Sequence, residues 1–146
     1  MTKDEIIVLL NEIVKHERKH FNYYQHCFLT IRGYERVILG PIFEKEMNSE
    51  LEHVCEFSSK IVALGGTPTM ESHSVTVPPN GLYHSIMLHN AINMEREILK
   101  IYHDAYPLAE RYAEEHGDMS IALLLEENIE HTTKDVEELE KLLPSL

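Results

Sequence analysis

Apolar side chains recur every three or four residues along most of this chain, which is the spacing expected for one buried face of a helix. Four stretches carry the pattern, namely residues 2–31, 41–64, 81–116 and 118–143. Thr2 is a suitable N-cap for the first stretch, and Pro41 suits the first turn of the second. Pro107 lies inside the third stretch, where we expect it to kink the helix or to mark a bulge. The pattern therefore predicts four long helices.

Helix-breaking residues separate these stretches. The segment "RGYERVILGP" is expected to form the first turn, "GGTP" to stop the second helix, and "HGD" to precede the fourth. Residues 65–80 lack helical spacing and are predicted to form an extended connection. Four helices with one long middle connection favour an all-α, up-down four-helix bundle with a crossover between the second and third helices. We expect a single domain over residues 1–146.

Composition and charge narrow the classes of protein that fit. The chain has 146 residues, 43% of them hydrophobic, which is enough for one domain with a sizeable core. Its formal net charge of -12 repels a phosphate backbone and argues against nucleic acid as a partner. We expect no membrane span and no signal peptide, because long apolar runs and a basic start are absent. Cys27 and Cys55, both expected to be buried thiols, fit a cytoplasmic protein without disulfides.

Polar side chains interrupt the apolar stripes at four core-facing positions, Glu17, Glu50, His53 and Glu95. An unpaired carboxylate in a core costs several kcal/mol, so each position needs a compensating partner. Glu50 and His53 are three residues apart and share one helix face. With a turn near Gly33, Glu17 and Glu50 lie at the same height of the first helical hairpin. A metal ion would neutralise this set, and the register therefore predicts a metal site.

The residue types indicate which metal is expected. Carboxylates mixed with imidazole suit iron or manganese, whereas structural zinc sites usually recruit cysteine. A single Glu-x-x-His on a Glu-rich helix also arises by accident, so the register of Glu17 with Glu50 and His53 carries the prediction. Glu17 and His20 form a second Glu-x-x-His. We interpret His20 as a pocket-edge or hydrogen-bonded histidine, with an extra metal ligand as the alternative.

Three segments resemble the ferritin-like superfamily, closest to bacterioferritin and its mini-ferritin-like relatives. "LNEIVKHERKHFNYY" is similar to the first helix of that family, "ELEHVCEFSSKIVALGGTP" to its Glu-x-x-His and helix stop, and "MEREILKIYHDAYPLAERYAEEHGD" to its third helix. The resemblance covers nearly the whole chain and implies a ferritin-like bundle. It implies that Glu17, Glu50, His53 and Glu95 bind iron in a diiron-carboxylate site. It also implies a catalytic Tyr24 that donates a hydrogen bond or an electron near that site.

The fourth helix departs from the family pattern, which has a second Glu-x-x-His there. His131 falls at the family's usual separation from Glu95, but Asn128 stands three residues before it. We favour a register in which Pro107 absorbs one extra helical turn as a bulge. In that register His131 completes the second metal position, with Glu127 assisting.

The alternative register is counted from the turn at Gly117. The expected Glu and His positions then hold Thr132 and Asp135. In this case the second metal position is degenerate, and Asn128, Thr132 and Asp135 are its weak ligands.

The resemblance implies a protein that handles iron. Fe(II) would bind and be oxidised by dioxygen or peroxide, a possible ferroxidase reaction that sequesters or stores iron and protects against iron-driven oxidative stress. Leu51 stands where the family has its haem-binding methionine, which argues against haem. A homo-oligomer, at least a dimer, is expected. The alternatives are a bundle with a degenerate site that serves as a structural or partner-binding protein, and a non-storing diiron oxidase.

Overall fold

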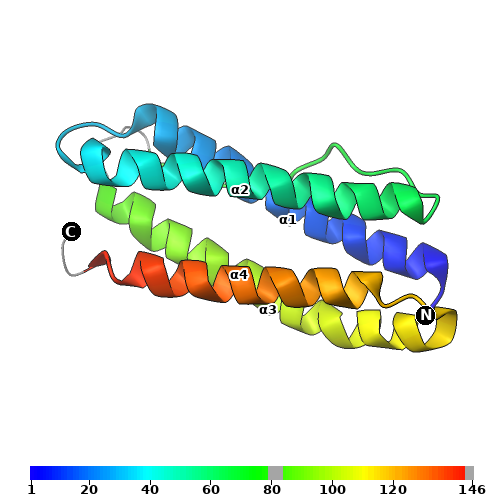
Figure 1. Cartoon of the computed structure of the whole chain (residues 1–146). Helices are drawn as coiled ribbons and strands as arrows, with labels where there is room; N and C mark the ends of the chain where they lie inside the picture. Colours follow the sequence, from blue (N-terminus) through cyan, green and yellow to red (C-terminus); the bar gives the residue numbers. More distant parts are fainter. Residues whose placement is uncertain (79–83, 144–146) are drawn as a thin grey trace.

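The structure is a computed structural model that describes residues 1–78 and 84–143. Within these residues the chain forms four helices: α1 (Lys3–Thr30), α2 (Glu35–Ala63), α3 (His84–His116) and α4 (Ser120–Glu140). α1 packs along α2, α3 packs along α4, and α1 also contacts α3 (Figure 1). The predicted all-α four-helix bundle with a long second-to-third connection is therefore confirmed.

α1 begins where its sequence predicts. The Thr2 hydroxyl accepts a hydrogen bond from the Glu5 backbone N–H at 3.1 Å, and Glu5 Oε1 accepts one from the Thr2 N–H at 3.4 Å. This reciprocal capping box satisfies two N–H groups that a helix start otherwise leaves unpaired. After α1, Gly33 adopts a φ of +84°, a conformation that only glycine reaches without strain, and reverses the chain toward α2.

The start of α2 corrects one sequence prediction. The helix begins at Glu35 rather than at Pro41, and Pro41 lies inside it. Pro41 has no N–H to offer the carbonyl of Val37, so the helix forgoes one hydrogen bond there. Gly40 reduces the remaining penalty, because it has no Cβ to collide with the proline ring that follows. Arg36 further ties this helix start to the end of α1 by donating to the carbonyls of Phe28 and Ile31.

The predicted stop of α2 at "GGTP" is confirmed. The Gly66 N–H donates to the Ile61 carbonyl and the Gly65 N–H to the Val62 carbonyl, each at 2.9 Å. Gly65 has a φ of +86°, so the end of α2 is a Schellman motif.

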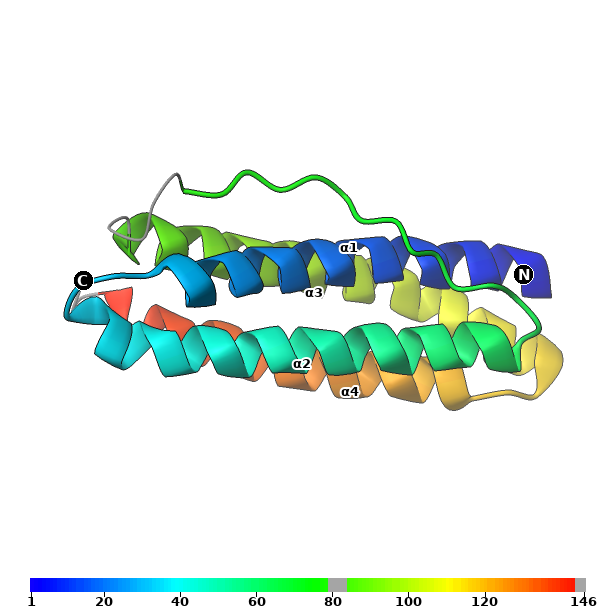
Figure 2. The same cartoon turned by 90° about the horizontal axis from the view of Figure 1, so that it is seen from above.

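Residues 67–77, which we call the strap, run along the outside of α1 without helix or strand (Figure 2). Asn11 clamps the strap, because its side-chain amide donates to the Thr67 carbonyl and its carbonyl oxygen accepts from the Thr69 N–H. Arg18 also donates to the Thr69 carbonyl. The predicted extended crossover is confirmed over the described residues.

The later helix bounds differ in detail from the predicted ones. The predicted start of the third helix at residue 81 lies outside the described residues. α3 is α-helical through Pro107, so the described helix has no π-bulge at that position. α4 spans Ser120–Glu140, a little shorter than the predicted residues 118–143. No described helix is long and apolar enough to cross a membrane.

The core consists of two apolar clusters with a polar layer between them. One cluster surrounds Leu10, Phe57 and Tyr102, and the other surrounds Tyr24 and Phe43. Between them, all four helices place buried polar side chains, namely Glu17, His20, Glu46, Glu50, His53, Glu95, Asn128, Thr132 and Asp135. Cys27 is buried, but Cys55 is exposed, contrary to the expectation for the second thiol.

Candidate metal centre

The polar layer contains two groups of three possible metal ligands. One group is Glu17, Glu50 and His53, and the other is His20, Glu50 and Glu95. In each group the three ligand atoms all lie within 4.8 Å of one another, and all five side chains are buried. α1, α2 and α3 supply these residues. Glu50 belongs to both groups, so the arrangement offers two adjoining metal positions with one shared carboxylate.

The first group has the spacing of a coordination shell. His53 Nδ1 lies 3.4 Å from Glu17 Oε2 and 3.4 Å from Glu50 Oε2. Ligands held about 2.1 Å from one ion are separated from each other by roughly 3.0 to 3.4 Å in octahedral or tetrahedral geometry. The three atoms are buried and have no hydrogen-bond partner. Buried polar atoms are normally satisfied, and a cation at this point would satisfy all three at once.

The second group includes His20, which is fully buried. Neither of its ring nitrogens has a hydrogen-bond partner. Burial lowers the pKa of His20 to about 4, so its ring is neutral at pH 7, the form that binds metals. The sequence favours a pocket-edge or hydrogen-bonded histidine at this position. The geometry instead fits the alternative, an additional ligand beside Glu50 and Glu95.

Without a bound metal, the acidic side chains of the centre hold protons unevenly. Burial, followed by repulsion from Glu17, raises the pKa of Glu50 well above its usual range. Burial and repulsion from Glu46 raise the pKa of Glu95 in the same way. Although burial alone would raise it, the close approach of Glu50 and His53 lowers the pKa of Glu17 to about 2. The metal-free centre therefore holds protons on Glu50 and Glu95 that a bound cation would displace.

Two tyrosines donate hydrogen bonds to the candidate ligands. The Tyr24 hydroxyl donates to Glu95 Oε1 at 2.7 Å, beside the predicted metal residue. The Tyr102 hydroxyl donates to Glu17 Oε1, and its ring stacks on Phe57 with 5.9 Å between centroids. The spacing of polar residues in the sequence did not predict this contact of Tyr102. The available signal was its position two helical turns after Glu95, on the same face.

A second pair of buried acids lies next to the centre. Glu46 comes from α2 and Asp135 from α4, and the two are 4% and 7% exposed. Burial, and then the charge of Asp135, raise the pKa of Glu46 to about 8. Glu46 precedes Glu50 by one helical turn, a spacing that could have indicated its inward position.

The α4 residues divide between the interior and the surface. Asn128, Thr132 and Asp135 are buried, whereas Glu127 is exposed and His131 is partly exposed. Glu127 and His131 belong to neither ligand group, and His131 instead contacts Ser49 and Asp135. Both line a surface pocket of about 200 Å³ between α2 and α4 that reaches His53. Of the first ligand group, His53 lines this pocket.

The comparisons with known proteins agree with this fold. Residues 7–146 match the family described as Ferritin, the ferritin-like domain. The chain therefore belongs to the ferritin-like family. No curated protein sequence matches it.

Among solved structures, the chain is similar to a ferritin-like, diiron-carboxylate protein from Bacillus anthracis. The two are 31% identical over 98% of this chain and 99% of that one, with a TM-score of 0.84. A Desulfovibrio desulfuricans bacterioferritin is 20% identical over 97% of this chain and 80% of that chain, with a TM-score of 0.80. A Bacillus brevis Dps protein is 19% identical over 97% and 96% of the two chains, with a TM-score of 0.84. The last two likenesses support the fold alone.

Proposed function

We propose that the protein binds Fe(II) at the buried centre, oxidises it with dioxygen or peroxide, and sequesters the ferric product. The observation that carries this proposal is Glu50, a buried carboxylate common to two groups of three ligand atoms. Two ferrous ions supply the two electrons that reduce dioxygen to hydrogen peroxide, or hydrogen peroxide to water. Two adjoining positions therefore suit the reaction. The 31% identity to a diiron-carboxylate protein supports the same function.

The residues of the chain would divide the work as follows. Glu17 and His53 would hold one ion and His20 and Glu95 the other, and Glu50, which belongs to both groups, would contribute to both positions. Carboxylate oxygens stabilise Fe(III) more than Fe(II), so this donor set favours oxidation. Tyr24 orients Glu95 through its hydrogen bond. The apolar clusters on both sides of the centre exclude bulk water, and the pocket at His53 offers ions a route inward.

Aerobic titration with Fe(II), followed by ferric absorbance, tests this proposal. The variants are Glu50→Gln and His20→Gln, and the matched control is His89→Gln, which changes an exposed histidine on α3. Loss of one ligand should slow oxidation by at least about tenfold in both site variants, whereas the control should oxidise at the wild-type rate. Equal rates in wild type and Glu50→Gln would exclude the buried centre as the place of oxidation.

A second candidate function rests on α4. Its inward side chains are Asn128, Thr132 and Asp135 instead of a Glu-x-x-His pair. This composition favours a bundle with a degenerate site that serves a structural or partner-binding role. Metal analysis of the purified protein separates the candidates. About two iron ions per chain support the diiron centre, about one supports a half-site, and none supports the structural role.

We also propose that the protein forms a homo-oligomer, at least a dimer. The outer faces of α1 and α2 expose large apolar side chains, including Val8, Leu29, Val37, Leu51 and Val62. Such surfaces are typical of association sites. Light scattering coupled to gel filtration measures the assembly. A dimer has no cavity for mineral and would fit a non-storing oxidase, whereas a large shell would fit iron storage.

A further inference from the structure

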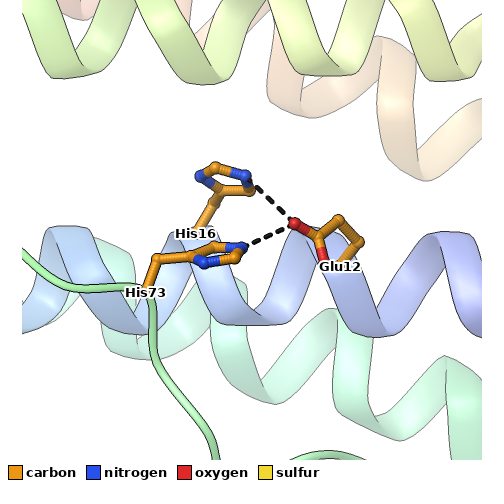
Figure 3. A group of neighbouring side chains, drawn as sticks. All are labelled: Glu12, His16 and His73. Carbon is orange, nitrogen blue, oxygen red and sulfur yellow. Dashed lines mark hydrogen bonds and ion pairs between the residues drawn. The ribbon is translucent and has the colours of Figure 1, made fainter.

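A second cluster of metal-binding side chains lies on the outside of the bundle, away from the buried centre. Glu12 and His16 come from α1, and His73 comes from the strap (Figure 3). Glu12 Oε1 lies 2.6 Å from His73 Nε2 and 3.5 Å from His16 Nε2. The two imidazole rings are tilted by 47° to each other, with 4.4 Å between their centroids. Three ligand atoms from two distant parts of the sequence thus converge on one point.

The backbone holds His73 in this position. The His73 N–H donates to the Lys15 carbonyl at 3.3 Å, next to His16. Before His73, the strap is also fastened to α1 by Asn11, through Thr69, and by Asn22, whose side chain donates to Ser72. The imidazole of His73 is therefore brought to α1 before any ion binds, which reduces the entropy cost of forming a site.

The surroundings of His16 favour metal binding by its outer nitrogen. His16 Nδ1 is buried without a hydrogen-bond partner and lies 3.4 Å from Glu97 Oε1. A metal on Nε2 would place the proton on Nδ1, directed at that carboxylate, which is the outer-shell arrangement common to metal-binding histidines. The nearby lysines do not leave a large positive charge, because Lys19 pairs with Glu97 and Lys15 with Glu71.

We propose that Glu12, His16 and His73 form a surface site that binds a divalent first-row transition-metal ion and fastens the strap to α1. Two imidazoles and one carboxylate suit such an ion, with water completing its shell. The 3.5 Å separation of Glu12 and His16 already fits ligands about 2.1 Å from one ion. The shorter distance between Glu12 Oε1 and His73 Nε2 has to increase by about 1 Å to admit the ion. The half-exposed Glu12 side chain permits this movement. The buried centre takes no part in this proposal.

Cobalt binding tests the site, because Co²⁺ absorbs visible light when protein ligands coordinate it. The parent protein carries Glu50→Gln, which removes the ligand shared by the two buried groups. Into this parent we would introduce His73→Gln or Glu12→Gln, with His103→Gln as the matched control, since His103 is an exposed histidine outside every cluster. We expect the Co²⁺ affinity to fall at least about tenfold in the two site variants and to stay unchanged in the control.

Hydrogen exchange provides an independent readout. Zn²⁺ should slow amide exchange in residues 67–77 of the parent protein, because the ion joins the strap to α1, and should not do so after His73→Gln. The proposal would be overturned if the Co²⁺ affinity stayed unchanged in both His73→Gln and Glu12→Gln. It would also be overturned if Zn²⁺ did not change the rate of amide exchange in the strap. Failure here would leave the proposal for the buried centre untouched, because neither readout measures binding at that centre.

Discussion

At the scale of single residues, two adjacent tyrosines show how burial serves different purposes in this bundle. Tyr23 and Tyr24 are both fully buried and belong to the same apolar cluster. The Tyr23 hydroxyl donates to the Met87 carbonyl at 2.9 Å, a contact within the scaffold. The Tyr24 hydroxyl donates to Glu95, a candidate ligand. Removing one hydroxyl or the other therefore distinguishes a contribution to the scaffold from a contribution to the site.

Replacing Tyr24 by Phe should weaken metal binding. The hydrogen bond from Tyr24 lowers the pKa of Glu95, so its loss leaves the carboxyl more firmly protonated and less oriented. We expect the Co²⁺ affinity, measured by calorimetry at pH 7, to fall about tenfold. Tyr23→Phe is the matched control and should cost about 1 kcal/mol of stability with no change in affinity. Equal affinities for both variants would contradict a role of Tyr24 at the centre.

The pair of Glu46 and Asp135 predicts a pH dependence of the metal-free protein. Glu46 ionises near 4.5 when unfolded but only at about 8 in the folded chain. Between these values the folded state binds the extra proton, so the free energy of unfolding should decrease as the pH rises, by at most about 1.4 kcal/mol per unit. Glu46→Gln removes this contribution. Between pH 6 and pH 8.5, the free energy of unfolding measured in urea should fall less in the variant than in wild type. An identical fall in both proteins would refute the assignment.

The residues that the sequence predicted best were those that interrupt an apolar stripe. Glu17, Glu50, His53 and Glu95 stood out because local spacing alone shows that they face inward. His20 was ambiguous, because its significance depends on having no hydrogen-bond partner in the folded core. His73 could not be found, since its loop position carries no periodicity and only the path of the strap brings it to α1.

At the scale of elements, boundaries that depend on local chemistry, such as the capped start of α1 and the stop of α2, were predictable, whereas the start of α2 was not. The "GGTP" stop depends on glycine conformation and is local, whereas the start of α2 depends on contacts from Arg36 to the end of α1. The register of α4 was ambiguous for a related reason. It is set by the length of α3 and by packing across the bundle, which place Asn128, Thr132 and Asp135 inside and leave Glu127 exposed.

The helix stop gives a prediction about stability. Gly65 has a φ of +86°, and a Cβ there would meet no other atom within 4 Å, so only backbone strain opposes substitution. Gly65→Ala should lower the free energy of unfolding by about 1 kcal/mol, because alanine rarely adopts this conformation. Gly65→Asn should lower the free energy of unfolding by less, since asparagine tolerates a positive φ better than alanine does. Denaturant unfolding measures both, and equal losses would show that strain is not the cause.

At the scale of the whole molecule, the arrangement of two apolar clusters around a polar layer explains how the bundle tolerates buried acidic side chains. Apolar clusters occupy both ends of the bundle, and every helix contributes to the polar layer between them. The two ends supply the hydrophobic stabilisation that the buried acids oppose. The chain also carries a net charge of -12, which adds repulsion to the compact state and attracts cations. The folded protein should therefore gain stability when metal binds.

Thermal unfolding of wild type and Glu50→Gln tests this coupling. At pH 8 and without metal, the variant should be at least as stable as wild type, because it no longer has to retain a proton on a buried carboxyl. With a divalent ion at about 100 times its dissociation constant, wild type should gain about 2.7 kcal/mol, a rise in melting temperature on the order of 10 °C. The variant should gain much less, so the order of stability should reverse. Parallel shifts in the two proteins would mean that the stabilising ion binds somewhere other than the buried centre that contains Glu50.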